Sequence, residues 1–227
     1  MRLKKWEDLP EFMRVDEIKP YYLILEKKKI SLVFKRVFDI IMSVILILLF
    51  FPIMLLISLL IKFDSQGPII YKQVRITQYG RRFKVYKFRT MVNNADKIGA
   101  HVTTQNDSRI TRVGKKIRDS RLDEFPQLFN VLKGDMSFVG TRPEAVKYFE
   151  HYTDEMKATL LLPAGITSMA SIMFKDEAAF LSNETDVDRT YIEKVLPQKM
   201  EYNLKSIEEF SLWKDLKTAV MTLGVVV

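Results

Sequence analysis

The chain has 227 residues, no cysteine and two histidines, with a formal net charge of +8 and a pI of about 9.4. Without cysteine it forms no disulfide and no thiolate metal site, and two histidines offer little material for a histidine-rich metal site or a Ser-His-Asp triad. Its hydrophobic content of 48% can build a core and excludes a wholly disordered chain. The positive charge favours anionic partners: nucleic acid, phospholipid headgroups or phosphorylated substrates.

The N-terminal residues 1–34 are mixed in character and rich in charge, and they contain Pro10 and Pro20. This composition predicts short helices or an arm that lies on the surface of the molecule. We expect a separate organisation for the residues that follow.

Residues 40–61 form an uncharged, strongly apolar segment. As a helix it would span roughly 33 Å, enough to cross the core of a bilayer. Pro52 lies near its middle and should bend or break the helix, because proline removes one backbone hydrogen bond and clashes with the carbonyl of residue 48. The segment therefore predicts a membrane element with an interruption at Pro52.

Basic residues flank this segment on both sides, and residues 65–95 carry seven Lys or Arg and no acid. Basic flanks prefer the cytoplasmic side of a membrane. A segment that enters, breaks at Pro52 and returns keeps both flanks inside, whereas a straight span sends one of them outward. The alternative is a transmembrane helix with a proline kink. The charge pattern favours re-entry.

Two runs of alternating character follow, at 68–75 and 81–90, and they predict a β-hairpin with its turn around Gly80. A helix is expected near 92–99, and "RVGKKIRDSR" (112–121) predicts a basic helix.

The stretch "DEFPQLFNVLKG" (123–134) predicts a further helix, with acids and proline in its first turn and Gly134 at its end. The remaining sequence is mostly of helical type. The fold class expected is therefore α+β and mostly helical, with a re-entrant membrane helix-break-helix before a small catalytic domain that contains a short β-hairpin.

Asp123 and Glu124 are adjacent acids at the expected start of this helix. Free backbone N–H groups and the positive end of the helix dipole would keep both ionised. An ionised Asp can bind a divalent cation or act as a nucleophile. Arg118 and Arg142 flank the pair, and guanidinium groups suit phosphate oxygens. Taken singly, each residue could equally be a helix cap or a surface charge; together they describe a site for anionic substrates at a membrane.

Five stretches in this order resemble the bacterial sugar transferases, also called monotopic phosphoglycosyl transferases. They are "KRVFD" (35–39), the apolar segment with Pro52, "GPIIYKQVRITQYGRRFKVYKFRTM" (67–91), "RLDEFPQLFNVLKGDMSFVGTRP" (121–143) and "GIT" (165–167). The resemblance runs from about Lys35 to the C-terminus, and its most specific part is the block 121–143.

The resemblance implies a function. Such enzymes transfer a phosphosugar from a UDP-sugar to a polyprenyl phosphate such as undecaprenyl phosphate, release UMP and require Mg²⁺. It implies a place on the cytoplasmic face of the bacterial inner membrane, with a re-entrant membrane element (35–62) and a cytosolic catalytic domain with membrane-interfacial helices (63–227). The N-terminal surface arm (1–34) precedes these two parts. Membrane lipids are expected partners, together with a second copy of the chain or downstream glycosyltransferases.

The resemblance also implies roles for residues. Asp123 is the nucleophile that forms a covalent phosphosugar intermediate, Glu124 assists it, and the metal is held at this pair. Four basic residues bind phosphate or substrate: Lys87, Arg89, Arg118 and Arg142. Three residues position the lipid phosphate or anchor the membrane entry: Lys35, Arg36 and Asp39.

Three departures from the family pattern stand out. Phe51 replaces the serine that often precedes the break proline, Thr141 stands where "GPRP" is usual, and Ala164 lies between Pro163 and the "GIT" motif. The region 164–182 differs most, so the identity of the sugar is the least transferable expectation.

Two other classes of function compete with this interpretation. A non-enzymatic peripheral protein that binds anionic lipid would explain the charge and the apolar segment but not the acid pair. A nucleic-acid binder could use the basic, aromatic hairpin, but the adjacent membrane segment argues against it, so no nucleic-acid partner is expected. Release of UMP from a UDP-sugar separates the enzyme from both.

Overall fold

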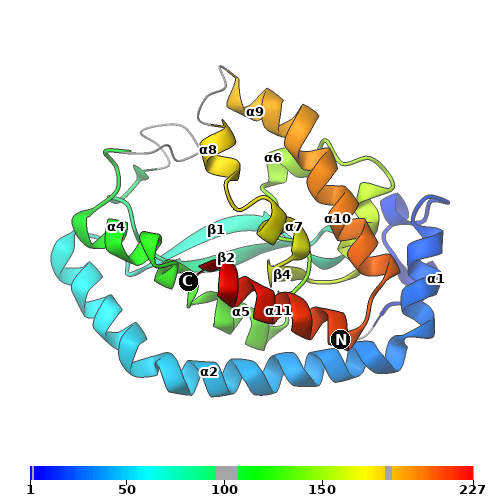
Figure 1. Ribbon diagram of the computed structural model, residues 1–227, viewed down its shortest axis with the longest axis horizontal. Helices are drawn as coiled ribbons and strands as arrows, with labels where there is room; N and C mark the ends of the chain where they lie inside the picture. Colours follow the sequence, from blue (N-terminus) through cyan, green and yellow to red (C-terminus); the bar gives the residue numbers. More distant parts are fainter. Residues whose placement is uncertain (2, 96–106, 182–185, 227) are drawn as a thin grey trace.

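The computed structural model describes residues 1, 3–95, 107–181 and 186–226 (Figure 1). Helices dominate, and the strands of the described residues form two small two-stranded sheets. The expected α+β, mostly helical class is confirmed. Most of the helix expected near 92–99 lies outside the described residues.

The N-terminal segment is part of the core and not only a surface arm. It forms the 3₁₀ turns η1 (Trp6–Asp8) and η2 (Glu11–Met13) and helix α1 (Lys19–Lys27). Met13, Ile18 and Leu25 are completely buried in the largest hydrophobic cluster, together with residues of η5 (Met156–Leu161) and α10 (Leu196–Glu208). Burial of these apolar side chains stabilises the fold because it removes their area from water. The expectation of a surface arm is therefore wrong for them.

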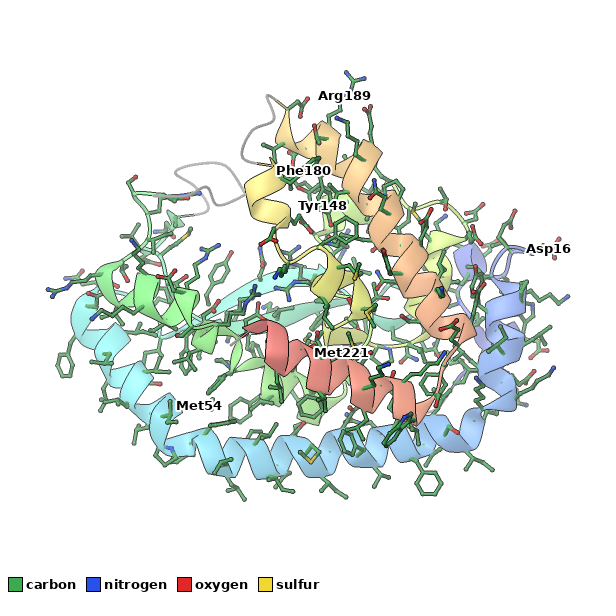
Figure 2. All side chains as sticks on the ribbon, in the orientation of Figure 1. Asp16, Met54, Tyr148, Phe180, Arg189 and Met221 are labelled. Atoms are coloured by element: carbon green, nitrogen blue, oxygen red, sulfur yellow. The ribbon has the colours of Figure 1, made fainter. Side chains whose placement is uncertain are left out.

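Helix α2 (Lys29–Asp64) is one continuous helix of 36 residues that contains Pro52. The predicted break is therefore absent, and the helix bends instead. In Figure 1, α2 runs beneath the body and then turns upward, and Figure 2 places Met54 at this turn. A long helix with an internal proline loses one hydrogen bond at that point and can curve there without ending.

Both ends of α2 lie against the same globular body (Figure 1). Beyond Pro52, Met54, Ile57 and Ile61 pack with Phe88 and Ile117 in a separate hydrophobic cluster. Much of the remaining apolar surface is open: Leu48 is 71% exposed and Phe51 is 57% exposed. Within the described part of the chain, α2 is the helix that is long and apolar enough to cross a membrane. Such an exposed apolar surface is compatible with a membrane-associated protein.

The predicted hairpin is confirmed. Strands β1 (Ile70–Ile76) and β2 (Arg82–Phe88) pair antiparallel, with Ile70 opposite Phe88 and Ile76 opposite Arg82. Their turn, η3 (Gln78–Gly80), has φ of +60° at Tyr79 and +73° at Gly80. The basic helix is also confirmed as α4 (Arg112–Asp119), whose first turn is capped by the Thr111 hydroxyl.

The acid pair does not start an α-helix. It lies in its own 3₁₀ turn, η4 (Leu122–Glu124), which follows Arg121 in the left-handed region at φ +53°. Helix α5 (Gln127–Lys133) begins only after Pro126 and ends, as expected, at Gly134 with φ +89°.

The chain after α5 forms β3 (Met136–Val139) and its parallel partner β4 (Ala164–Thr167), joined through α6 (Val146–Phe149) and η5. The remaining elements are helical. They are α7 (Met169–Met173), α8 (Glu177–Leu181), α9 (Val187–Thr190), the π-helical turn η6 (Tyr191–Val195), α10 and α11 (Leu212–Val226). Helices α8, α9 and α10 cover the hairpin from the side away from α2 (Figure 1).

Candidate active site

A cavity of about 810 Å³ is lined by residues from the hairpin, α4, η4, α7, α8 and α10. Its size falls within the range of small-molecule sites. Among the described residues that line it, nine are Lys or Arg and four are Asp or Glu. This excess of cations suits a ligand with several negative charges.

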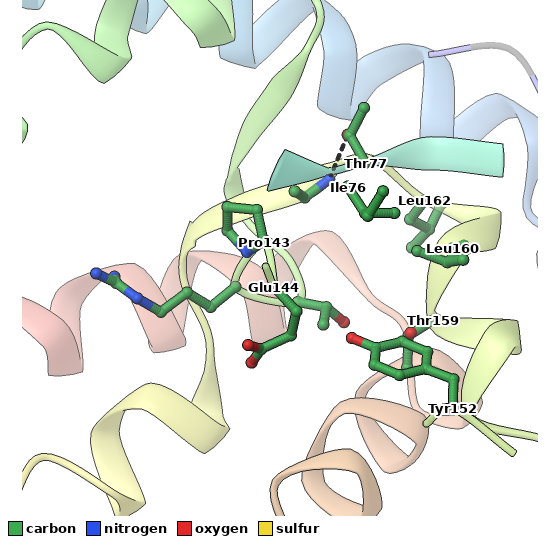
Figure 3. A pocket seen from close by; sticks show the side chains of 11 residues that line it. Ile76, Thr77, Pro143, Glu144, Tyr152, Thr159, Leu160 and Leu162 are labelled. Atoms are coloured by element: carbon green, nitrogen blue, oxygen red, sulfur yellow. Dashed lines mark hydrogen bonds between the residues drawn. The ribbon is translucent and has the colours of Figure 1, made fainter. Parts of the chain in front are cut away.

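A second pocket lies beside the loop that carries Pro143 and Glu144, against Ile76 and Thr77 (Figure 3). Its volume of about 10 Å³ is at most that of a single water molecule. The larger cavity is therefore the candidate for substrate.

Glu124 is held between two cations. Its Oε1 accepts hydrogen bonds from Lys87 Nζ at 2.8 Å and from Arg142 Nη2 at 2.7 Å. Burial opposes ionisation of this carboxyl, but Arg142 and Lys87 outweigh it and hold the pKa of Glu124 well below its usual range. Glu124 is therefore ionised and fixes the positions of Lys87 and Arg142.

Asp123 has a different environment, although it is the next residue and lines the same cavity. Within the described ranges, no hydrogen bond to its carboxylate is formed, so the group faces the cavity uncommitted. Burial raises the pKa of Asp123, as does the charge of Glu124, while Lys87, Arg118 and Arg142 lower it. The arrangement leaves one carboxylate available for chemistry beside one whose Oε1 is held by two cations.

The structure brings three of the predicted phosphate-binding residues to the acid pair. Lys87 and Arg142 contact Glu124 directly, and Arg118 reaches the same cavity from α4. The guanidinium of Arg142 is also within 3.5 Å of the Ile166 carbonyl. This part of the predicted site is thus assembled in space.

Arg89 is placed differently. It is 5% exposed, and it donates hydrogen bonds to the backbone carbonyls of Ser65 and Gln66 and to the Ser65 hydroxyl, at the C-terminal end of α2. A cation suits the negative end of a helix dipole. The Nη groups of Arg89 attach the end of α2 to the hairpin, which favours a structural role, while phosphate binding by this cavity-lining residue stays a prediction.

Lys35, Arg36 and Asp39 also make internal contacts. Lys35 Nζ lies 2.5 Å from Asp215 Oδ2 on α11, and Arg36 donates to the carbonyls of Val131 and Leu132 at the end of α5. Asp39 is 1% exposed, and its Oδ1 accepts from the backbone N–H of Phe138 at 3.3 Å. These contacts hold α2 against the body, a role that the sequence pattern did not predict, and the expected roles in binding the lipid phosphate or anchoring the membrane entry stay predictions.

Over residues 30–227 the sequence matches the family described as bacterial sugar transferase. The chain belongs to the bacterial sugar transferase family.

Curated relatives of this family member carry consistent names. A UDP-glucose:undecaprenyl-phosphate glucose-1-phosphate transferase of Klebsiella pneumoniae is 41% identical over 199 residues, which cover 86% of this chain and 40% of the relative. A UDP-N-acetylgalactosamine-undecaprenyl-phosphate N-acetylgalactosaminephosphotransferase of Aeromonas hydrophila is 39% identical over 83% of this chain and 42% of the relative. The chain spans about two fifths of the length of these relatives. A putative undecaprenyl-phosphate N-acetylgalactosaminyl 1-phosphate transferase of Bacillus subtilis is 43% identical over 60% of this chain and 75% of the relative.

The acid pair fits a magnesium ion in part. In the part of the chain that the structure describes, no group of three or more His, Cys, Asp or Glu side chains could enclose a metal. Mg²⁺, however, is commonly held by one or two carboxylates together with substrate phosphates and water. The uncommitted carboxylate of Asp123 in a cationic cavity suits that mode, in which a diphosphate supplies further ligands.

Arg75, Glu177 and Lys199 are among the polar residues of the cavity wall that the sequence pattern missed. They come from β1, α8 and α10, so no spacing in the sequence connects them. In the sequence, the only indication of a role for one of these three residues was the departure of the region 164–182, which includes Glu177, from the family pattern.

Proposed function

We propose that the protein is a phosphoglycosyl transferase that moves a sugar phosphate from a UDP-sugar to undecaprenyl phosphate and releases UMP. The observation that carries this proposal is the uncommitted Asp123 carboxylate beside Glu124, which Lys87 and Arg142 hold in a cationic cavity. The names of the relatives support the same substrates.

The proposed reaction has two displacements at one phosphorus. A carboxylate oxygen of Asp123 attacks the phosphorus bonded to the sugar, and the bond from that phosphorus to the UMP oxygen breaks, so UMP leaves. The phosphosugar is then bonded to Asp123. A phosphate oxygen of the lipid attacks the same phosphorus and the bond to Asp123 breaks, which gives the lipid diphosphosugar and restores the carboxylate.

The other residues act electrostatically. Lys87, Arg118 and Arg142 line the cavity where the phosphates would lie, and their cations stabilise the negative charge that develops in each displacement. Glu124 keeps Lys87 and Arg142 in place and stays ionised itself. It is therefore a positioning group and a poor candidate for a general acid.

Asp123, with Glu124 beside it, would hold Mg²⁺ together with the diphosphate. When bound, the ion supplies positive charge that neutralises the phosphate oxygens.

The decisive test is the covalent adduct. The protein is incubated with a UDP-sugar and Mg²⁺ but no lipid acceptor, and intact-protein mass spectrometry should show one added phosphosugar with release of UMP. Digestion should map it to the peptide that holds Asp123, and Asp123→Asn should form none. Asp16→Asn, an exposed acid remote from the cavity (Figure 2), is the matched control and should label normally. An adduct at another residue would refute the nucleophile, and absence of UMP release with every UDP-sugar would favour the non-enzymatic lipid-binding protein.

For the membrane we propose a re-entrant α2 in the cytoplasmic leaflet of the bacterial inner membrane. The arrangement that supports it is the bent helix with both ends against one body and basic residues at both flanks. Because the chain has no cysteine, Lys27→Cys and Gln66→Cys provide single labels at exposed positions on the two sides of the segment. Neither should react with an impermeant thiol reagent in intact cells, and both should react after permeabilisation. Labelling of one alone in intact cells would show a span.

A further inference from the structure

A second polar cluster lines the same cavity as the acid pair. Glu177 on α8, Lys199 on α10 and Arg75 on β1 contribute to its wall. Arg142 connects this cluster to the acid pair: its Nη2 bonds Glu124, and the charges of Glu144 and Glu177 stabilise its protonated form. The two clusters are therefore neighbours on either side of one guanidinium.

The ammonium of Lys199 is fixed by three acceptors. Its Nζ lies 3.0 Å from Glu177 Oε2, 3.1 Å from the Tyr191 hydroxyl and 3.5 Å from Glu144 Oε1. The Tyr191 hydroxyl in turn donates to Glu144 Oε1 at 2.7 Å. Lys199, Glu144 and Tyr191 are each less than a tenth exposed. A satisfied, buried network of this kind fixes the orientation of its members.

Hydrogen-bonding capacity remains on the cavity side of this network. The side chain of Glu177 is 27% exposed, and its Oε1 accepts no hydrogen bond from the residues that the structure describes. Arg75 donates one hydrogen bond, from Nη2 to Gln73 Oε1 at 2.9 Å, and its other donors are not closed off from the cavity. The cluster thus offers a carboxylate oxygen and guanidinium N–H groups on fixed supports.

A buried ion network commonly stabilises a fold no better than well-packed apolar side chains do, so stability alone does not account for polar groups that stay open to the cavity. A carboxylate beside a guanidinium suits two adjacent hydroxyls, one as donor and the other as acceptor. In a UDP-sugar bound with its sugar-bearing phosphorus at Asp123, the group next to that phosphorus is the sugar. The uridine lies one phosphate further away.

We propose that Arg75, Glu177 and Lys199 form the sugar-recognising end of the cavity, and that Glu177 accepts a hydrogen bond from one of the vicinal 3- and 4-hydroxyls of the transferred sugar. This inference rests on the proposed function. It implies that the substrates are UDP-hexoses or UDP-N-acetylhexosamines with both hydroxyls free, and that the wall formed by α8 discriminates among them.

The test measures kcat/KM for UMP release with UDP-glucose, UDP-N-acetylgalactosamine and the 3-deoxy and 4-deoxy analogues of the better substrate. The kcat/KM of the wild-type protein should be lower by about 10-fold or more with the analogue that lacks the recognised hydroxyl. Glu177→Gln keeps an acceptor but loses the charge that strengthens the bond, so its kcat/KM should fall about 10-fold with the parent sugar and less with that analogue, because both changes act on the same hydrogen bond. Inhibition by UDP should be unchanged in the variant. Glu193→Gln removes an exposed carboxylate that pairs with Arg189 on the surface, and it should behave as wild type.

Thermal melting of Glu177→Gln establishes that the fold is intact. If Glu177→Gln lost kcat/KM equally for the parent and deoxy sugars, the cluster would serve the fold. If UDP inhibited the variant more weakly, the cluster would bind the nucleoside. Either result would overturn the inference. If wild type released no UMP from any UDP-sugar, the proposed function itself would fail, and the inference with it.

Discussion

Two charged clusters in this protein are built from the same residue types but behave differently. The cavity cluster consists of Lys87, Asp123, Glu124 and Arg142; the anchor cluster consists of Lys35, Arg36, Asp39 and Asp215. Each holds two acids beside two cations. In the anchor cluster the contacts join α2 to α11, α5 and β3. In the cavity cluster, Asp123 keeps its carboxylate free.

This difference in free carboxylate distinguishes a cluster that stabilises the fold from one that can act on a ligand. The charges of the anchor cluster make contacts within the fold, and Asp39 Oδ2, which has no hydrogen-bond partner among the described residues, is buried, so the cluster serves to fix helices. A charge that is partly buried, uncommitted and surrounded by oppositely charged groups in a cavity is poised for chemistry. Mutations in the two clusters should accordingly affect different properties.

The largest expected effect comes from Asp123→Asn. An amide is a poor nucleophile and a poor magnesium ligand, so turnover should fall by about 10³-fold or more. Because Asp123 makes no hydrogen bond within the described residues and its ionised form is disfavoured by burial, the melting temperature should not fall. Initial rates of UMP release and a melting curve on the same preparation check both statements. A variant that is unstable and inactive would place Asp123 with the scaffold.

Lys35→Met is the corresponding change in the anchor cluster. It leaves Asp215 without its cation, and loss of one partner of a largely buried pair costs about 3 kcal/mol of the free energy of unfolding. Turnover by the fraction that stays folded should remain near wild type. Lys29→Met breaks the exposed pair with Glu26 and should change stability far less, because solvent screens an exposed ion pair. Denaturant unfolding in detergent measures both. Undiminished stability together with a raised KM for the lipid would restore Lys35 to the substrate site.

Arg142→Lys tests the cation shared by the acid pair and the sugar end of the cavity. Lysine keeps the charge but loses the fork of donors, so the variant should lose about 1–3 kcal/mol of transition-state stabilisation, measured as kcat/KM. Arg89→Lys is the matched comparison, since its fork binds the end of α2. That variant should lose stability more than turnover. The reverse result would exchange the roles assigned to the two arginines.

Local patterns predicted much of the fold. The hairpin, helix α4 and the end of α5 at Gly134 follow from alternation, helical periodicity and a left-handed glycine. The acid pair was assigned to the first turn of an α-helix, but the left-handed Arg121 and the position of Pro126 isolate it in a 3₁₀ turn. The continuous path of α2 through Pro52 depends on packing at both of its ends, which no local signal contains.

The sequence predicted only those residues of the site that lie close to one another along the chain. Asp123, Glu124, Arg118 and Arg142 lie within one specific block, and the structure brings them together. The motif at Lys35 does not distinguish a lipid-phosphate site from an anchor, because its partner Asp215 lies 180 residues away. Tertiary packing brings Glu177 and Lys199 to the cavity, so the spacing of residues along the sequence could not predict their place there.

The smallest expected effect compares the two adjacent acids by their pH dependence of stability, in metal-free protein. The pKa of Glu124 is lowered on folding, so its ionised form stabilises the protein above the unfolded pKa, and this contribution is lost as pH falls toward the folded value. Glu124→Gln should therefore be less stable than wild type at pH 7, with a difference that narrows on acidification. The pKa of Asp123 is raised on folding, mainly by burial, so its contribution is present below the unfolded pKa and is lost as pH rises through the folded value. Asp123→Asn should thus gain stability relative to wild type between pH 4 and pH 7. Melting temperatures of the three proteins, measured from neutral pH to well below the usual pKa of glutamate, should give differences of opposite slope. Parallel slopes would mean that the two carboxylates share one environment, and the distinction between an engaged and a free acid would be lost.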